Sequence, residues 1–145
     1  MMRVENLRSP SATVGGIVYF GRMLDKIRLH AAGKLPSEYQ ENLGDGFDEV
    51  CCKFLWVEYP AVVKRTLAGG SDEEILEWAM QEGRRPDEQE IKVWNGFMSK
   101  RGWRDEVSER LLTRKRDGGW SDREDIQTFF DFIDLDEGRD PASRR

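Results

Sequence analysis

Signals that start and stop helices recur along the whole chain, and they constrain its fold more than any other feature. Ser71 with Glu74, and Asp87 with Glu90, have the spacing of capping boxes, in which each side chain hydrogen-bonds the backbone N–H of the other residue. Apolar residues then recur at helical spacing. Several of these runs end at glycines that can adopt the left-handed conformation that terminates helices: Gly33, Gly69, Gly70, Gly83 and Gly102.

The same pattern predicts about seven helices and no convincing strand. We therefore expect an all-α protein, folded as a compact single-domain bundle of short helices with an orthogonal or irregular arrangement. The predicted helices run from about Val14 to Ala32, from Phe47 to Leu55, from Pro60 to Gly69, from Ser71 to Gly83, from Pro86 to Gly102, from Asp105 to Lys115, and from a capping box at Ser121 past Ile133.

The chain length and the connections indicate one domain. The 145 residues are the size of a single domain, and no linker divides the predicted helices. We expect residues 7–138 to form one helical domain. The last stretch is polar and is interrupted by Pro141, so residues 139–145 are predicted to be a flexible C-terminal tail.

The charge of the chain disfavours nucleic acid as a partner. The net charge is −5, whereas nucleic-acid-binding domains are usually basic. Residues 1–70 carry 9 basic and 8 acidic side chains, whereas residues 71–145 carry 14 and 20, so an anionic ligand would favour the first half. One basic stretch near a helix end is read as a solvated cap rather than a nucleic-acid patch: Arg110, Arg114, Lys115 and Arg116.

The cysteines and the hydropathy pattern indicate a cytoplasmic protein without a metal centre. Cys51 and Cys52 are neighbours, which is a poor arrangement for a disulfide, and we expect them to pack in or near the core. His30 is the single histidine, and it is predicted to be solvated or to cap a helix end. These three residues do not supply a metal site, and no cofactor is expected. No signal peptide or membrane span is visible.

Two charges in the first predicted helix are unusual. On a helix that starts near Val14, Asp25 and Arg28 fall within the apolar arc, while Arg22 and Lys26 fall on the narrower polar side. Asp25 and Arg28 are three residues apart and can face each other. Either they form a buried ion pair that sets how later helices dock, or they build a polar pocket in which an arginine holds an anion.

Several stretches of the chain occur in a distinctive order: "LRSPS", "GGIVYFGRMLDKIRLHAAGKL", "SDEEILEW", "EIKVWN" and "DIQTFFDFIDLDEG". They contain an R-S-P stretch, a G-G pair and R-x-x-D-K-x-R in the first predicted helix, followed later by D-I-x-T-[WF]-F-D. In this order they resemble the bacterial domain-of-unknown-function family 5069 (DUF5069), whose hallmark is this set of motifs. The resemblance runs from about Leu7 to Gly138.

The resemblance implies positions rather than an activity. It adds Arg8 in the opening motif and Asp48 at the start of the second helix to the charged set of the first helix. The segment "PSEYQENLGDGF" is longer than the short Pro- and Cys-containing linker of many family members. The candidate ligand-binding residues are Arg22, Asp25, Lys26, Arg28, Arg8 and Asp48.

No familiar catalytic or nucleotide-binding motif is present. The chain has no Walker loop, no dinucleotide-binding glycine pattern, no G-x-S-x-G and no H-E-x-x-H. The leading hypothesis is a binding module for a protein partner or a small anionic ligand, centred on the charged first helix. The alternative is an enzyme with an unfamiliar site in which Asp25 acts as general acid or base beside Arg28.

Overall fold

Helices account for almost all of the regular structure in the computed structural model, which describes residues 3–144. Its only described strands are β1 (Thr13–Val14) and β2 (Ile17–Val18), so the predicted all-α class is confirmed. The helices are α1 (Phe20–Ala31), α2 (Ser37–Gln40), α3 (Phe47–Leu55), α4 (Tyr59–Leu67), α5 (Asp72–Glu82), α6 (Glu88–Lys100), α7 (Ser108–Asp117), α8 (Phe129–Asp136) and the 3-10 helix η1 (Pro141–Arg144).

A short hairpin lies where the sequence predicts the start of the first helix. The two strands pair antiparallel, with Val14 opposite Ile17. Gly15 and Gly16 connect them with φ values of 57° and 80°, as a tight hairpin turn requires. The expected absence of strands and the predicted start at Val14 are therefore wrong. Helix α1 begins at Phe20, because the two left-handed glycines reverse the chain within the apolar run.

The two predicted capping boxes in the middle of the chain are confirmed. The Ser71 hydroxyl accepts from the N–H of Glu74, the Asp87 carboxylate accepts from the N–H of Glu90, and both glutamates return the bond. These local pairs begin α5 and α6 at the predicted places.

The capping box predicted at Ser121 does not form, and this start of the last helix is wrong. Helix α8 begins at Phe129, where the Thr128 hydroxyl accepts from the N–H of Asp131. The preceding loop is held instead by the buried Lys115, whose Nζ donates to the backbone carbonyls of Arg123 and Ile126 at 2.7 and 3.0 Å. These two hydrogen bonds stabilise the loop conformation. Because Lys115 is buried, it is not part of the solvated basic cap that the sequence predicts.

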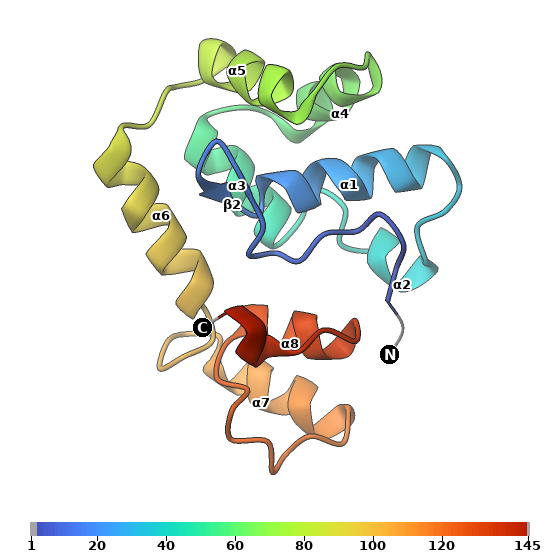
Figure 1. Ribbon diagram of the computed structural model, residues 1–145, viewed down its shortest axis with the longest axis vertical. Helices are drawn as coiled ribbons and strands as arrows, with labels where there is room; N and C mark the ends of the chain where they lie inside the picture. The colour runs from blue at the N-terminus through green and yellow to red at the C-terminus, as the bar shows by residue number, and fades with distance from the viewer. Residues whose placement is uncertain (1–2, 145) are drawn as a thin grey trace.

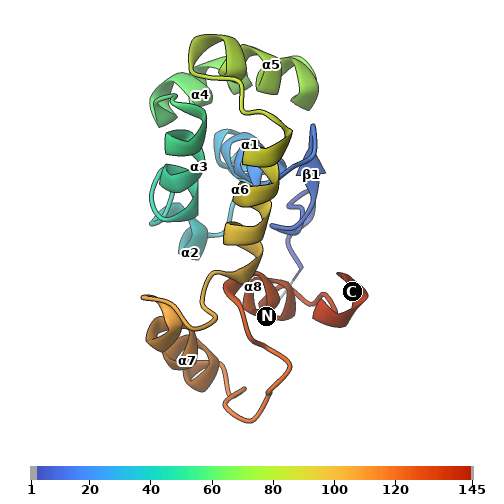
Figure 2. The same ribbon diagram turned by 90° about the vertical axis from the view of Figure 1, so that its left-hand side faces the viewer.

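The helices form layers along an elongated molecule. Helices α4 and α5 lie at one end, α1 and α3 in the middle, and α7 and α8 at the other end (Figure 1). Helix α6 runs along one side and connects the two ends (Figure 2). Every helix within residues 3–144 is too short or too polar to span a lipid bilayer.

Helix α1 lies at the centre of the main hydrophobic core. Phe20, Met23, Leu24 and Ile27 are buried and pack with apolar side chains from the hairpin and from α3, α4, α5, α6 and α8. Burial of several such side chains, each contributing about 1.5–3 kcal/mol, is a dominant stabilising contribution. A smaller apolar cluster joins α7 to α8 at the far end of the molecule.

The N-terminal segment lies back along α1 and meets the C-terminal part of the domain. Leu7 packs with Leu29 of α1 and with Leu35, and its carbonyl accepts a hydrogen bond from the Arg139 guanidinium at 2.5 Å. Pro141, within η1, is buried. This crossing brings Arg8 of the opening motif next to the charged residues of α1.

Candidate functional site

The surroundings of α1 differ from those predicted for a helix with one polar side. Arg22 and Lys26, expected on that side, are only 4% and 6% exposed. Helix α1 runs through the middle of the molecule and is covered from several directions (Figure 1). Its charged side chains therefore meet internal partners, and each partner comes from a different segment of the chain.

The main partner of Asp25 is Arg8 rather than Arg28. The Arg8 guanidinium contacts both oxygens of the Asp25 carboxylate at 2.9 Å, and the Arg8 backbone N–H donates to the same carboxylate. The closest Arg28 nitrogen lies 3.9 Å from Asp25. A Cβ at Gly21 would lie 2.8 Å from the Arg8 Cζ atom, so this glycine makes room for the guanidinium. The pair joins the N-terminal segment to α1.

Arg8 and Arg28 share a second carboxylate, that of Asp72 in the first turn of α5. Arg8 Nη1 lies 2.8 Å from Oδ2 of Asp72, and Arg28 Nη1 lies 2.8 Å from Oδ1. Burial raises the pKa of Asp72, but the hydrogen bonds from Arg28 and Arg8 outweigh that effect and leave its pKa below the ordinary value. About a third of each arginine side chain is exposed, so this cluster lies at the protein surface.

Arg22 forms a buried ion pair with Glu137, the residue after α8. Two nitrogens of the guanidinium bind the two carboxylate oxygens at 2.8 and 2.6 Å. Tyr39 and Arg139 also donate to Glu137. Burial raises the pKa of Glu137, but the bonds from Arg22 outweigh this and lower the pKa overall. The cluster ties α1 to both the α2 region and the C-terminal part of the chain.

Lys26, Asp48 and Tyr19 form a second buried cluster between α1 and α3. Lys26 Nζ lies 2.8 Å from the Asp48 carboxylate and donates to the Tyr19 hydroxyl, which in turn donates to Asp48. Gly44 donates its N–H to the other oxygen of Asp48. Burial lowers the pKa of Lys26, and Asp48 opposes this shift. Asp48 is fully buried, so this cluster holds α3 against α1.

The six predicted residues are therefore divided among three ion-pair clusters. Only Arg8 and Arg28 present an appreciable part of their side chains to solvent. The sequence did not indicate five of the residues in these clusters, and most of them are remote in sequence from the side chains that they contact, although Tyr19 is seven residues from Lys26 and Arg139 is two residues from Glu137. These five residues are Tyr19, Tyr39, Asp72, Glu137 and Arg139.

Asp25 has the surroundings of a structural carboxylate. Both of its oxygens already accept hydrogen bonds from Arg8, and its side chain is only 10% exposed. A general base needs a free lone pair within reach of a substrate proton. The geometry therefore lends no support to proton transfer by Asp25.

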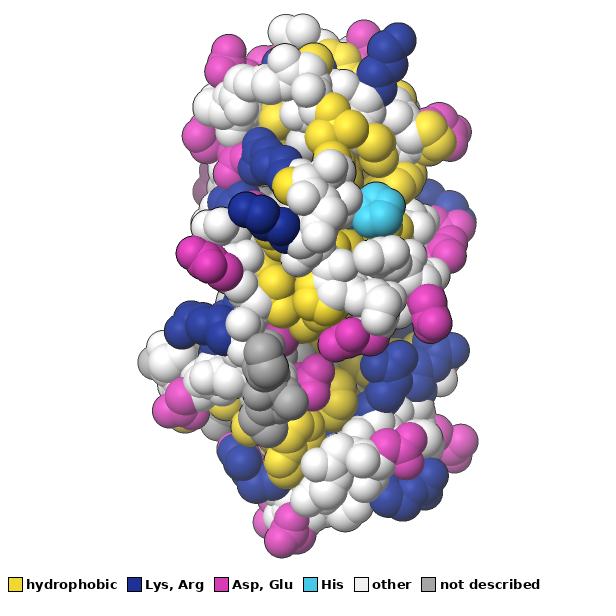
Figure 3. All heavy atoms as spheres, turned by 90° about the vertical axis from the view of Figure 1, so that its right-hand side faces the viewer, with side chains coloured by type: hydrophobic (Ala, Val, Ile, Leu, Met, Phe, Trp, Pro, Cys, Tyr) yellow, Lys and Arg dark blue, Asp and Glu magenta, His cyan; other side chains and the backbone are white. Residues whose placement is uncertain are grey.

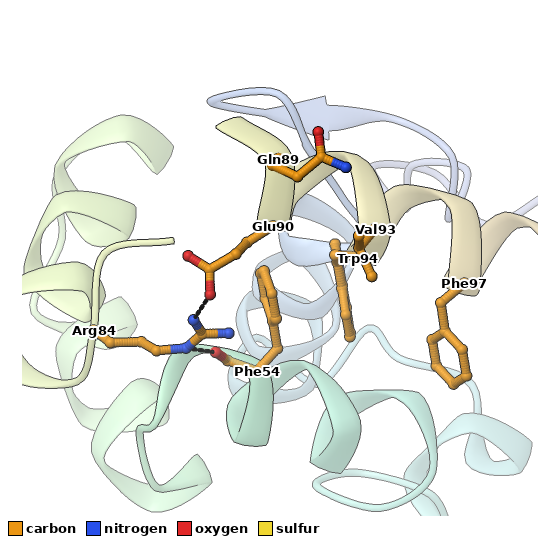
Figure 4. A pocket seen from close by; sticks show the side chains of 7 residues that line it. All are labelled: Phe54, Arg84, Gln89, Glu90, Val93, Trp94 and Phe97. Carbon is orange, nitrogen blue, oxygen red and sulfur yellow. Dashed lines mark hydrogen bonds and ion pairs between the residues drawn. The ribbon is translucent and has the colours of Figure 1, made fainter. Parts of the chain in front are cut away.

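A different surface, between α3 and α6, carries a hollow with apolar walls. Phe54 of α3 stacks on Trp94 of α6, with ring centroids 4.6 Å apart and an interplanar angle of 10°. The Arg84 guanidinium lies over the Phe54 ring and is held by the Phe54 carbonyl and by Glu90 (Figure 4). The groove encloses about 310 Å³, and its lining residues are Phe54, Arg84, Gln89, Glu90, Val93, Trp94 and Phe97.

Trp56 stands beside this groove with 69% of its surface exposed. It follows α3 in the left-handed conformation, with φ of 60°, and the Arg84 guanidinium lies 5.3 Å from its ring centroid. Trp56 also lines a second hollow of about 510 Å³, together with residues that include Cys52 and Tyr59. A Cβ at Gly83 would lie only 1.9 Å from the Leu55 carbonyl oxygen, so Gly83 permits the close backbone contact beneath Trp56.

The cysteines and the histidine lie where the sequence predicts. Cys51 and Cys52 are free and buried. Burial raises the pKa of the Cys52 thiol to about 12, so it is protonated at neutral pH. His30 is exposed and is seen as the cyan side chain in Figure 3. On the face shown there, acidic and basic side chains are interspersed.

Comparison with known proteins places the chain in a family. No curated protein matches it. The family described as "Domain of unknown function (DUF5069)" matches residues 4–139, which includes the N-terminal segment, α1, the groove and α8. Because this match spans nearly the whole chain, the protein belongs to the DUF5069 family.

Proposed function

We propose that this domain is a protein-interaction module that holds a helical segment of a protein partner in the groove between α3 and α6. One observation carries the proposal: large apolar side chains line a preformed groove and remain exposed. Val93 is 62% exposed and Phe97 is 46% exposed. Large apolar side chains grouped at a surface hollow are typical of protein-binding sites.

The rigidity of the groove supports this function. The Phe54–Trp94 stack fixes its floor, and two hydrogen bonds fix the Arg84 side chain at its edge. Side chains that are already ordered lose little conformational entropy when a partner binds. A groove formed along a helix suits an amphipathic helix whose apolar residues recur three and four positions apart.

Selection of displayed helical peptides against the full chain tests this proposal. The affinity of the selected peptides is then measured for the wild type, for Phe97→Glu and for Leu112→Glu. Leu112 is a matched control because it lies on α7 and is as exposed as Val93. We expect Phe97→Glu to weaken binding at least about tenfold and Leu112→Glu to leave it unchanged. Peptides that bind both variants equally would contradict the proposed docking surface.

A small anionic ligand is the second candidate, and the Arg8–Arg28–Asp72 cluster supports it. Two guanidinium groups contact the two oxygens of one carboxylate, and both side chains are partly exposed. An external carboxylate or phosphate has the same pair of acceptor oxygens and could exchange with Asp72. In this proposal only Arg8 and Arg28 contact the ligand. The other predicted residues hold these two arginines or helix α1 in place: Arg22, Asp25, Lys26 and Asp48.

The anion proposal predicts that the internal carboxylate competes with the ligand. Citrate and inorganic phosphate are titrated by calorimetry into the wild type, Asp72→Asn and Arg28→Gln. We expect Asp72→Asn to bind the anions more tightly and Arg28→Gln to bind them more weakly, with Lys53→Gln as an exposed control. Equal affinities for all four proteins would reject this candidate.

We also propose that the domain acts in the cytoplasm. The two free thiols support this location, because reducing compartments keep cysteines unpaired. Fractionation of cells that produce a tagged full-length chain tests it, and recovery outside the cytoplasmic fraction would contradict it.

A further inference from the structure

Resting on the protein-interaction function above, we propose that the partner at this surface is a second copy of the same chain, with the two α6 helices packed antiparallel. One side of α6 is suited to such a contact. At 3.6 residues per turn, five residues of α6 lie within one arc of about 100° around the helix axis. Four of them have the spacing i, i+4, i+7 and i+11, and the fifth is the apolar residue Phe97. The five are Gln89, Val93, Gly96, Phe97 and Lys100, and all of them except Gly96, which is partly buried, are exposed.

Gly96 is the first specific indication of a helix partner. It lies in the middle of α6, where glycine lowers helix stability relative to alanine. A Cβ placed there would meet no atom within 4 Å, so packing within the described part of the chain does not require a glycine. A missing side chain lets another helix approach closely. In an antiparallel pair, Val93 of each copy would lie over Gly96 of the other.

The order of charges along α6 favours a second copy of the same helix as the partner, and it favours the antiparallel direction. The first turn carries Glu88, and the other end carries Lys100. Glu90 and Arg101 have the same signs at these two ends, but they are already paired within the chain, with Arg84 and with Asp105 and Glu106. An antiparallel second α6 brings the acidic start of each helix next to the basic end of the other, whereas a parallel copy would place like charges together. The helix dipoles are also opposed in the antiparallel pair.

The symmetry of this arrangement also accounts for a closed assembly. An isologous two-fold contact uses the same surface on both copies, so each surface is covered once and no open-ended polymer follows. Val93 and Phe97 would become buried against their counterparts, and the rims of the two grooves would meet. The contact uses residues of the groove without requiring any change in the α1 ion-pair clusters.

Sedimentation equilibrium of the full chain gives the first test. We expect a reversible dimer at protein concentrations up to about 100 µM, which is the range of modest interfaces. Gly96→Gln should fold normally, because the space around Gly96 is open, but should raise the dissociation constant at least about tenfold by preventing close approach. Leu112→Gln on α7 is the matched control and should dimerise like the wild type.

Cysteine cross-linking gives the direction of the helices. Gln89→Cys and Lys100→Cys are prepared separately, one of them with a tag, and are oxidised alone and as a mixture. The buried native thiols keep the background low. The antiparallel pair predicts a cross-linked heterodimer in the mixture and little product from either variant alone. Efficient cross-linking of each variant with itself would overturn the antiparallel arrangement.

The outcomes separate this inference from the function on which it rests. A chain that stays monomeric, yet binds helical peptides in a Phe97-dependent manner, rejects the second copy and keeps the interaction function. A dimer that Gly96→Gln does not weaken rejects α6 as the contact. Failure of both the dimer and the peptide binding rejects both proposals.

Discussion

Arg8 donates three hydrogen bonds to the carboxylate of Asp25, which lies 17 residues later in the sequence. Its Nε, Nη2 and backbone N atoms all lie 2.9 Å from the carboxylate oxygens. A guanidinium and a carboxylate in this paired geometry form the strongest kind of side-chain hydrogen bonding found in proteins. The contact joins the N-terminal segment to the central helix, so its loss should release that segment.

The first prediction concerns this contact. Asp25→Asn should lower the free energy of unfolding by about 2 kcal/mol, which is less than for a fully buried pair because Arg8 is partly exposed. Lys53→Met, which breaks an exposed pair with Glu49, should change it by less than about 0.5 kcal/mol. Urea denaturation of the two variants measures both values, and equal effects would contradict the structural role of Asp25.

The second prediction concerns the buried pair between Arg22 and Glu137. Arg22→Met should cost about 3–5 kcal/mol, because it leaves the Glu137 carboxylate buried with fewer donors. The double variant Arg22→Met, Glu137→Leu should recover part of this loss. A double-mutant cycle of denaturation free energies isolates the coupling, and strictly additive losses would show that the two side chains do not depend on each other.

The third prediction concerns acid stability. The pKa of Glu137 lies below its ordinary value of 4.5, since the bonds from Arg22 outweigh the effect of burial. The unfolded chain therefore binds more protons than the folded one in this range, and stability contributed by Glu137 is present above about pH 4.5 and is lost as the pH falls. Denaturation across acidic pH should show a shallower loss for Glu137→Gln than for the wild type. An unchanged slope would contradict this contribution.

The fourth prediction compares two glycines that stand in opposite surroundings. Gly83→Ala should destabilise the protein by about 2–4 kcal/mol, because its Cβ would collide with the Leu55 carbonyl. Gly96→Ala, at an open helical position, should stabilise dilute protein by about 0.5–1 kcal/mol. Thermal unfolding of both variants at low protein concentration checks the opposite signs, and a loss of stability at Gly96 would show an unforeseen contact there.

The sequence by itself determined the features whose causes lie within a few residues. Ser71 and Glu74 are three positions apart, and their capping box starts α5 where it was predicted. The apolar spacing from Phe47 to Leu55 likewise predicts the observed limits of α3. Such bonds form inside one turn of helix, so the residue pattern contains all of their partners.

Local patterns were misleading where two signals competed. The apolar run from Val14 continues into α1, but Gly15 and Gly16 reverse the chain within it. Ser121 and Glu124 have capping-box spacing, yet Lys115 holds the loop around them by its backbone carbonyls. In both regions a turn or a tertiary hydrogen bond outweighed helix propensity, which is a weak preference.

Only the tertiary structure decided which charges meet. Arg28 is three residues from Asp25, but its closer partner is Asp72 on α5. Arg22 pairs with Glu137, which is 115 residues away in the sequence, and no pattern near either residue predicts this contact. The stacking of Phe54 on Trp94 in the groove is likewise a contact between helices that are distant in the sequence. Ion pairs and aromatic stacks depend on the path of the folded chain, because their short contact distances are set by packing rather than by sequence spacing.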